Sequence, residues 1–105
     1  MIKIKLNKDE VMHMRILLMN CAEILSMKGR NVGLQIIVEL LVEMADSLAA
    51  KLQNIAQKKY TWSLIRSHQL TLYALTSMVN LNMMPYEAIL VRKIIAAIDQ
   101  RYPFN

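Results

Sequence analysis

The clearest helix signals in the sequence lie in Asn7–Gly29, which reads N-K-D-E-V-M-H-M-R-I-L-L-M-N-C-A-E-I-L-S-M-K-G. Asn7 can cap a helix that has Glu10 at its third position, which is the arrangement of a capping box. Gly29 suits the left-handed conformation that ends many helices. Between them, apolar residues recur at the helical 3-4 spacing, namely Val11, Met14, Leu18, Cys21 and Leu25. The stretch therefore predicts a helix over residues 8–28.

Similar signals predict three further helices. Asn31 can cap a helix over residues 32–58, and Pro85 favours the first turn of a helix over residues 85–101. A helical apolar spacing between them places another helix at residues 61–82, with Tyr60 and Trp62 near its start. These two aromatic residues either cover the end of the core or form an exposed anchor pair. Short links between long helices favour antiparallel neighbours, so we predict an all-α, up-and-down four-helix bundle that forms one domain over residues 1–105.

Residues 1–6 differ from the rest of the chain because they alternate, reading M-I-K-I-K-L. Alternation is typical of a strand with one buried face. We find no second run inside the chain for it to pair with. We therefore expect a short extended arm, which either lies on the bundle or pairs with a copy of itself in an oligomer.

Composition favours a globular protein. Of the 105 residues, 55% are hydrophobic and only four are Gly or Pro, which argues against disorder. Cys21 is the only cysteine, so no internal disulfide forms, and a reducing, cytoplasmic location is expected. The longest uncharged run, between Arg66 and Glu87, contains too many polar residues for a membrane span.

Two of the predicted helices carry a second apolar face, on the side opposite the core. Flexible methionines suit adaptable interfaces, and a second apolar face needs a second layer of packing. We therefore predict a small, non-enzymatic protein–protein interaction module that forms a homodimer or binds another protein. The interface residues that we expect are Met12, Ile16, Met19 and Met27 on the first helix and Leu70, Ala74, Met78 and Leu81 on the third.

Charge suggests an alternative function. The formal net charge is +5, and an up-and-down bundle would gather much of it at one end. The residues of this basic end are Lys3, Lys5, Lys8, Lys58, Lys59 and Arg101. Clustered cations attract the phosphates of nucleic acids. The alternative is therefore a nucleic-acid-binding accessory protein that uses this basic end.

A third function follows from carboxylates on the second helix. Glu43-x-x-Asp46, with Glu23 on the preceding helix, resembles part of the ExxE…ExxD pattern of the all-helical MazG-type nucleotide pyrophosphatases. The resemblance covers only the first two helices, and Asn20 stands where that pattern has its first Glu. It implies a magnesium-dependent nucleotide hydrolase. Because Glu43 and Asp46 lie opposite the core stripe of their helix, an ordinary charged surface is expected instead.

We find no support in the sequence for a catalytic or metal-binding site built on histidine or cysteine. His68 falls on the core stripe of the predicted helix 61–82, so we expect a hydrogen-bonded core histidine. It has no second His or Cys at ligand spacing, and Cys21 lies on a buried stripe. We therefore predict no catalytic residues, no metal ligands and no cofactor.

Overall fold

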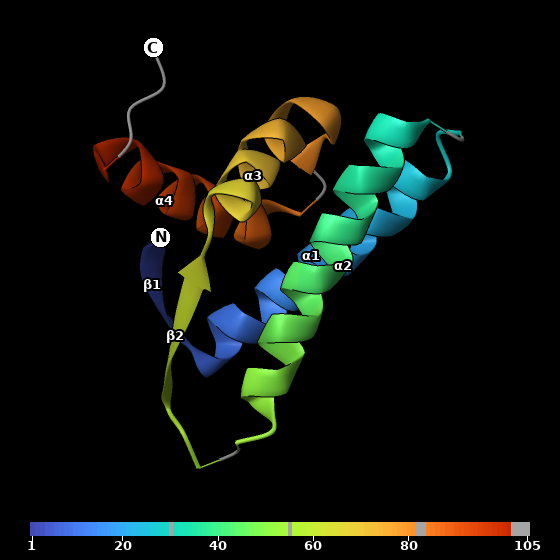
Figure 1. Cartoon of the computed structure of the whole chain (residues 1–105). Helices are drawn as coiled ribbons and strands as arrows, with labels where there is room; N and C mark the ends of the chain where they lie inside the picture. Colours follow the sequence, from blue (N-terminus) through green and yellow to red (C-terminus); the bar gives the residue numbers. More distant parts are fainter. Residues whose placement is uncertain (30, 55, 82–83, 102–105) are drawn as a thin grey trace.

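The computed structural model describes residues 1–29, 31–54, 56–81 and 84–101, and it combines helices with a small sheet (Figure 1). Its elements in chain order are β1 (Ile2–Asn7), α1 (Lys8–Ser26), α2 (Val32–Leu52), β2 (Lys59–Leu64), α3 (Arg66–Met78) and α4 (Pro85–Arg101). None of the described helices is long and apolar enough to cross a membrane.

The predicted all-α, up-and-down four-helix bundle is wrong, because the fold is an α+β arrangement. Residues 59–64 form a strand, so the helix expected at 61–82 begins only at Arg66, and the helix expected at 32–58 ends at Leu52. Residues 2–7 do form the extended segment that the alternation predicts. They pair with β2 of the same chain, where no partner run was expected.

β1 and β2 form a two-stranded antiparallel ribbon with one buried face. The register places Ile2 opposite Leu64, Ile4 opposite Trp62, and Leu6 opposite Tyr60. These residues alternate with exposed ones along both strands, and all of them except the half-buried Ile4 are buried. A slip of one residue would turn this apolar set toward solvent, so burial fixes the register.

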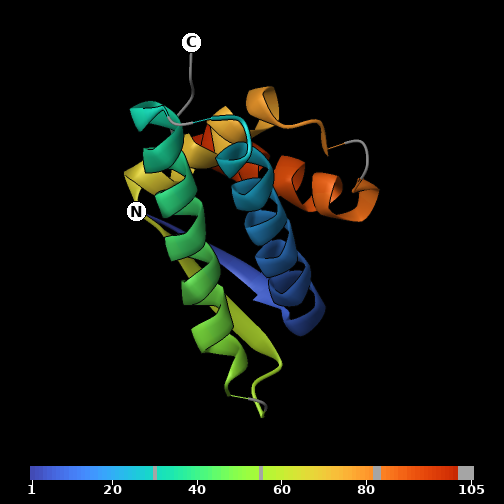
Figure 2. The ribbon, with the colours of Figure 1, turned by 90° about the vertical axis from the view of Figure 1, so that its right-hand side faces the viewer.

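α1 and α2 form an antiparallel hairpin that lies on one side of the ribbon (Figure 2). Asn7 and Glu10 make both bonds of the predicted capping box, at 2.8 and 3.0 Å. Gly29 has a φ of 125°, a left-handed conformation that other residues rarely adopt, and Asn31 caps α2. The predicted core stripe of α1 is confirmed, because all five residues are fully buried.

The order strand-helix-helix occurs twice along the chain, although the sequence gives no sign of a repeat. β1, α1 and α2 form the first set, and β2, α3 and α4 form the second. The two sets are joined by the strand pair, and each helix hairpin contacts the other set: α1 packs against α4, and α2 packs against α3. The ribbon therefore lies where the two sets meet.

Candidate functional site

The outer face of the ribbon is an exposed, wholly polar surface. Six residues form it, and register pairs them as Lys3 with Ser63, Lys5 with Thr61, and Asn7 with Lys59. All six are exposed, and none is acidic. The face therefore combines three ammonium groups with hydroxyl and amide groups that can donate and accept hydrogen bonds.

The inner face of the ribbon explains why the outer face is wholly polar. Trp62 and Tyr60 are 1% and 2% exposed, and the Tyr60 hydroxyl donates a hydrogen bond to the backbone oxygen of Asn54 at 3.1 Å. The hydrophobic effect holds these rings against the helices, so the alternating residues Lys59, Thr61 and Ser63 face solvent. Of the two sequence-based interpretations of the aromatic pair, core coverage is correct.

The predicted basic end of a bundle does not form, because the chain does not adopt the up-and-down topology. Lys3, Lys5 and Lys59 lie instead on the outer face of the ribbon. Lys8, the first residue of α1, and Lys58 line a shallow pocket beside the end of the ribbon where Asn7 pairs with Lys59. The sixth residue, Arg101, ends α4, and its side chain lies outside the part of the structure that is described.

The second apolar face predicted for α1 is present. Met12, Ile16, Met19 and Met27 are 43%, 47%, 42% and 73% exposed. We call these four residues the α1 stripe. They lie opposite the buried side of α1, at the helical spacing that puts them on one surface.

The second apolar face predicted for α3 is only partly exposed. Leu70 is 44% exposed, but Ala74 and Met78 are half-buried. Leu81 lies beyond the end of α3 and is buried in the core, so the expectation that it would face a partner is wrong. The reason is that the helix ends at Met78, whereas the expectation assumed that the helix continues through Leu81.

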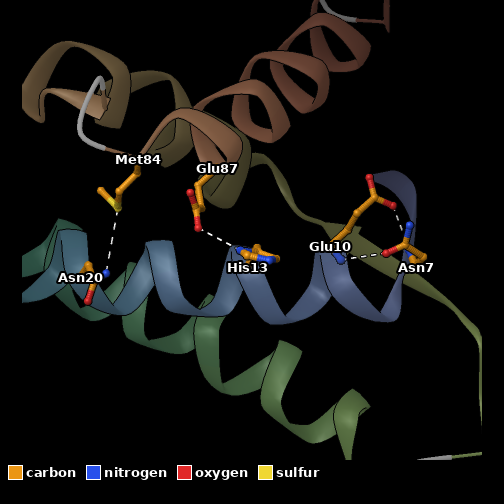
Figure 3. A network of polar contacts seen from close by, with 6 residues as sticks. All are labelled: Asn7, Glu10, His13, Asn20, Met84 and Glu87. Atoms are coloured by element: carbon orange, nitrogen blue, oxygen red, sulfur yellow. Dashed lines mark hydrogen bonds and ion pairs between the residues drawn. The ribbon is translucent and has the colours of Figure 1, made fainter.

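α4 covers one flank of α1 through polar contacts (Figure 3). The Nδ1 atom of His13 lies 2.9 Å from Oε1 of Glu87, and the amide nitrogen of Asn20 lies 4.0 Å from the sulfur of Met84. The His13 ring also contacts the Tyr86 ring, with 4.4 Å between centroids. The hydrogen bond from His13 lowers the pKa of Glu87, although partial burial opposes this shift. These contacts hold α4 on one flank of α1. The α1 stripe lies outside this flank and is not covered by α4.

His68 is the hydrogen-bonded core histidine that the sequence predicts. It is 8% exposed, and its Nε2 lies 3.2 Å from Oε1 of Glu43 on α2. Its Nδ1 is buried and has no hydrogen-bond partner among the described residues. The contact ties α3 to α2.

The carboxylates that resemble the pyrophosphatase pattern do not form a metal site in the part of the chain that is described. Glu23, Glu43 and Asp46 are all exposed, as expected of a charged helix face. No three His, Cys, Asp or Glu side chains gather closely enough there to hold an ion. Cys21 is buried, and burial raises the pKa of its thiol to about 11, which suppresses the reactive thiolate.

The β2 half of the ribbon face was missed in the sequence, although a signal for it exists. Residues 59–64 read K-Y-T-W-S-L, in which large apolar and polar residues alternate. Aromatic and β-branched residues with this alternation are typical of strands. No protein-family model, curated protein or solved structure matches this chain.

Proposed function

We propose that this protein binds double-stranded DNA through the outer face of the β1–β2 ribbon. The observation that carries the proposal is that all six outward residues are exposed and polar, that Lys3, Lys5 and Lys59 are cationic, and that none is acidic. Lysines supply the phosphate contacts on which affinity for nucleic acids depends. Thr61, Ser63 and Asn7 add groups that can hydrogen-bond to base edges.

The dimensions of the ribbon fit the major groove of B-form DNA. Two antiparallel strands of six residues are about 20 Å long. The major groove is about 12 Å wide and admits a two-stranded ribbon, whereas the deep and narrow major groove of RNA duplexes excludes side chains. Duplex DNA is therefore a better ligand for this face than duplex RNA.

The orientation of the aromatic residues argues against single strands. Proteins that bind single-stranded nucleic acids stack the bases on exposed aromatic rings. Tyr60 and Trp62, the aromatic residues of the ribbon, point into the core and are buried. The outer face thus offers charge and hydrogen bonds but no stacking platform.

The test is a salt titration of binding to a labelled DNA duplex, followed by fluorescence anisotropy between about 50 and 200 mM salt. Wild-type affinity should fall steeply, and the Lys5→Ala/Lys59→Ala variant should lose about two units of the slope of log K against log salt. The matched control is Lys28→Ala/Arg92→Ala, which removes the same charge from the turn after α1 and from α4. Equal losses in the two variants, or no wild-type binding at low salt, would refute the proposal.

A separate observation supports a second candidate, a non-enzymatic protein–protein interaction through α1. The α1 stripe places exposed apolar side chains along one surface of a helix, and such surfaces commonly mark interfaces. The free, buried thiol of Cys21 fits the reducing cytoplasm as the location in which either function would operate.

A further inference from the structure

The α1 stripe lies between two covered flanks of its helix. On one flank, Glu87 of α4 contacts His13, and Met84, the residue before α4, contacts Asn20; α2 packs against the other side. Beside the stripe lies an open groove between α1 and α2, lined by the apolar residues Met19, Ala22, Val38 and Val42 and by the polar residues Asn20, Glu23 and Ser26. No described segment of the chain fills this groove, so a partly apolar surface remains that runs along α1 and onto α2.

Two opposite charges lie along this stripe, one on each side of its centre. Arg15 precedes Met19 by four residues, and Glu23 follows it by four. Side chains three or four residues apart share one helix face, so both charges border the stripe. Both residues are exposed, and neither side chain has a hydrogen-bond or ion-pair partner among the described residues.

Arg15 and Glu23 cannot pair with each other on one helix, because eight residues separate them by about 12 Å along the axis. The two residues can form ion pairs, however, if the α1 helix of a second copy packs antiparallel against the stripe. A two-fold axis near Met19 places Arg15 of each copy opposite Glu23 of the other, which forms two equivalent ion pairs. The same axis brings Met12 of one copy to the last turn of the other, near Met27.

We propose that two copies of this chain associate through antiparallel packing of their α1 helices, with the two-fold axis near Met19 and reciprocal Arg15–Glu23 ion pairs. A second copy is favoured over an unrelated helix because the surface complements itself. In the antiparallel pair, the apolar centre of one stripe packs against the identical centre of the other. The two-fold axis also places each Arg15 beside a Glu23 of the other copy, so that both charges are paired. This dimer deepens the second candidate function and does not depend on DNA binding by the ribbon.

The test measures the solution mass by sedimentation equilibrium across a wide concentration range. Wild type should dimerise, and Ile16→Glu should weaken dimerisation at least about tenfold, because it buries an unpaired carboxylate. The matched control is Ile89→Glu on α4, where the native side chain is 64% exposed, and dimerisation should be unchanged.

Charge exchange then tests the geometry itself. Arg15→Glu and Glu23→Arg should each weaken the dimer, and the double variant should restore it, as should an equimolar mixture of the two single variants. A wild type that stays monomeric at high concentration overturns the proposal. So does a dimer that survives Ile16→Glu, or a double variant as weak as the single ones. DNA binding is measured separately on the same variants, so failure of the dimer is distinguishable from failure of the ribbon proposal.

Discussion

Alanine substitutions along β2 should alternate in their effect on stability with a period of two. Tyr60, Trp62 and Leu64 are each no more than 2% exposed, whereas Thr61 and Ser63 lie on the exposed face. A strand sends successive side chains to opposite faces. Removal of an inward side chain therefore leaves a cavity in the core, and removal of an outward one does not.

The size of the alternation follows from burial. Truncation of a buried aromatic residue such as Trp62 costs about 3–5 kcal/mol, and truncation of Leu64 costs about 2–5 kcal/mol. Surface substitutions such as Ser63→Ala usually change stability by less than about 0.5 kcal/mol. Because small domains have total stabilities of about 5–15 kcal/mol, Trp62→Ala should remove a large share of the free energy of unfolding.

The assay is urea denaturation of each single variant, followed by far-ultraviolet circular dichroism. Circular dichroism is required because Trp62 is the only tryptophan and therefore the main intrinsic fluorophore. Thr61→Ala serves as the neighbouring control for Trp62→Ala. Equal costs for the outward substitutions Thr61→Ala and Ser63→Ala and the inward substitutions Tyr60→Ala and Leu64→Ala would contradict the strand assignment of β2. Costs that followed a helical period of three to four residues would contradict it as well.

Other predictions concern α1 and its contacts. Because the hydrogen bond from His13 lowers the pKa of Glu87, this contact stabilises the fold above the unfolded-state pKa of the carboxyl group and loses this effect as the pH falls through its folded-state pKa. Glu87→Gln should therefore lower stability by less than about 1 kcal/mol at neutral pH, a difference that vanishes in acid; a difference independent of pH in urea titrations would contradict the pair. Cys21 should resist a thiol reagent in the native state and react once the protein is denatured; rapid native labelling would disprove its burial. Asn7→Ala removes the side-chain acceptor for the Glu10 N–H and should cost about 1 kcal/mol in thermal denaturation; an unchanged melting temperature would count against the cap.

Local signals in the sequence predicted the parts of the fold that depend on neighbouring residues. The capping box needs only Asn7 and Glu10, which are three residues apart, and the structure contains both of its bonds. The core stripe of α1 and the start of α4 at Pro85 were likewise correct. These features are decided within one or two helical turns, so the chain carries their full pattern locally.

The ribbon could not be predicted in the same way because its two strands are far apart in the sequence. Strand pairing joins Leu6 to Tyr60 across the whole α1–α2 hairpin. A six-residue strand that directly precedes a helical pattern is easily assigned to the helix. Trp62 and Leu64 were assigned in this way to the helix predicted at residues 61–82. Because β2 was predicted as part of a helix, the predicted positions of the lysines were wrong as well. The basic end was derived from the topology of a four-helix bundle.

The lysines of the ribbon have a second physical role, and this role makes different predictions. Edge strands of a sheet carry unpaired backbone groups, and lysines on such strands discourage pairing with other chains. Edge protection requires charge on the strands but no particular face. If this were the only role of the lysines, Lys5→Ala would increase aggregation and leave the salt dependence of DNA binding unchanged. A DNA-binding face requires that Lys5 and Lys59 act together with the outward hydroxyls of Thr61 and Ser63. The slope of the salt titration separates the two roles, because only contact with phosphates releases counterions in proportion to the number of lysines engaged.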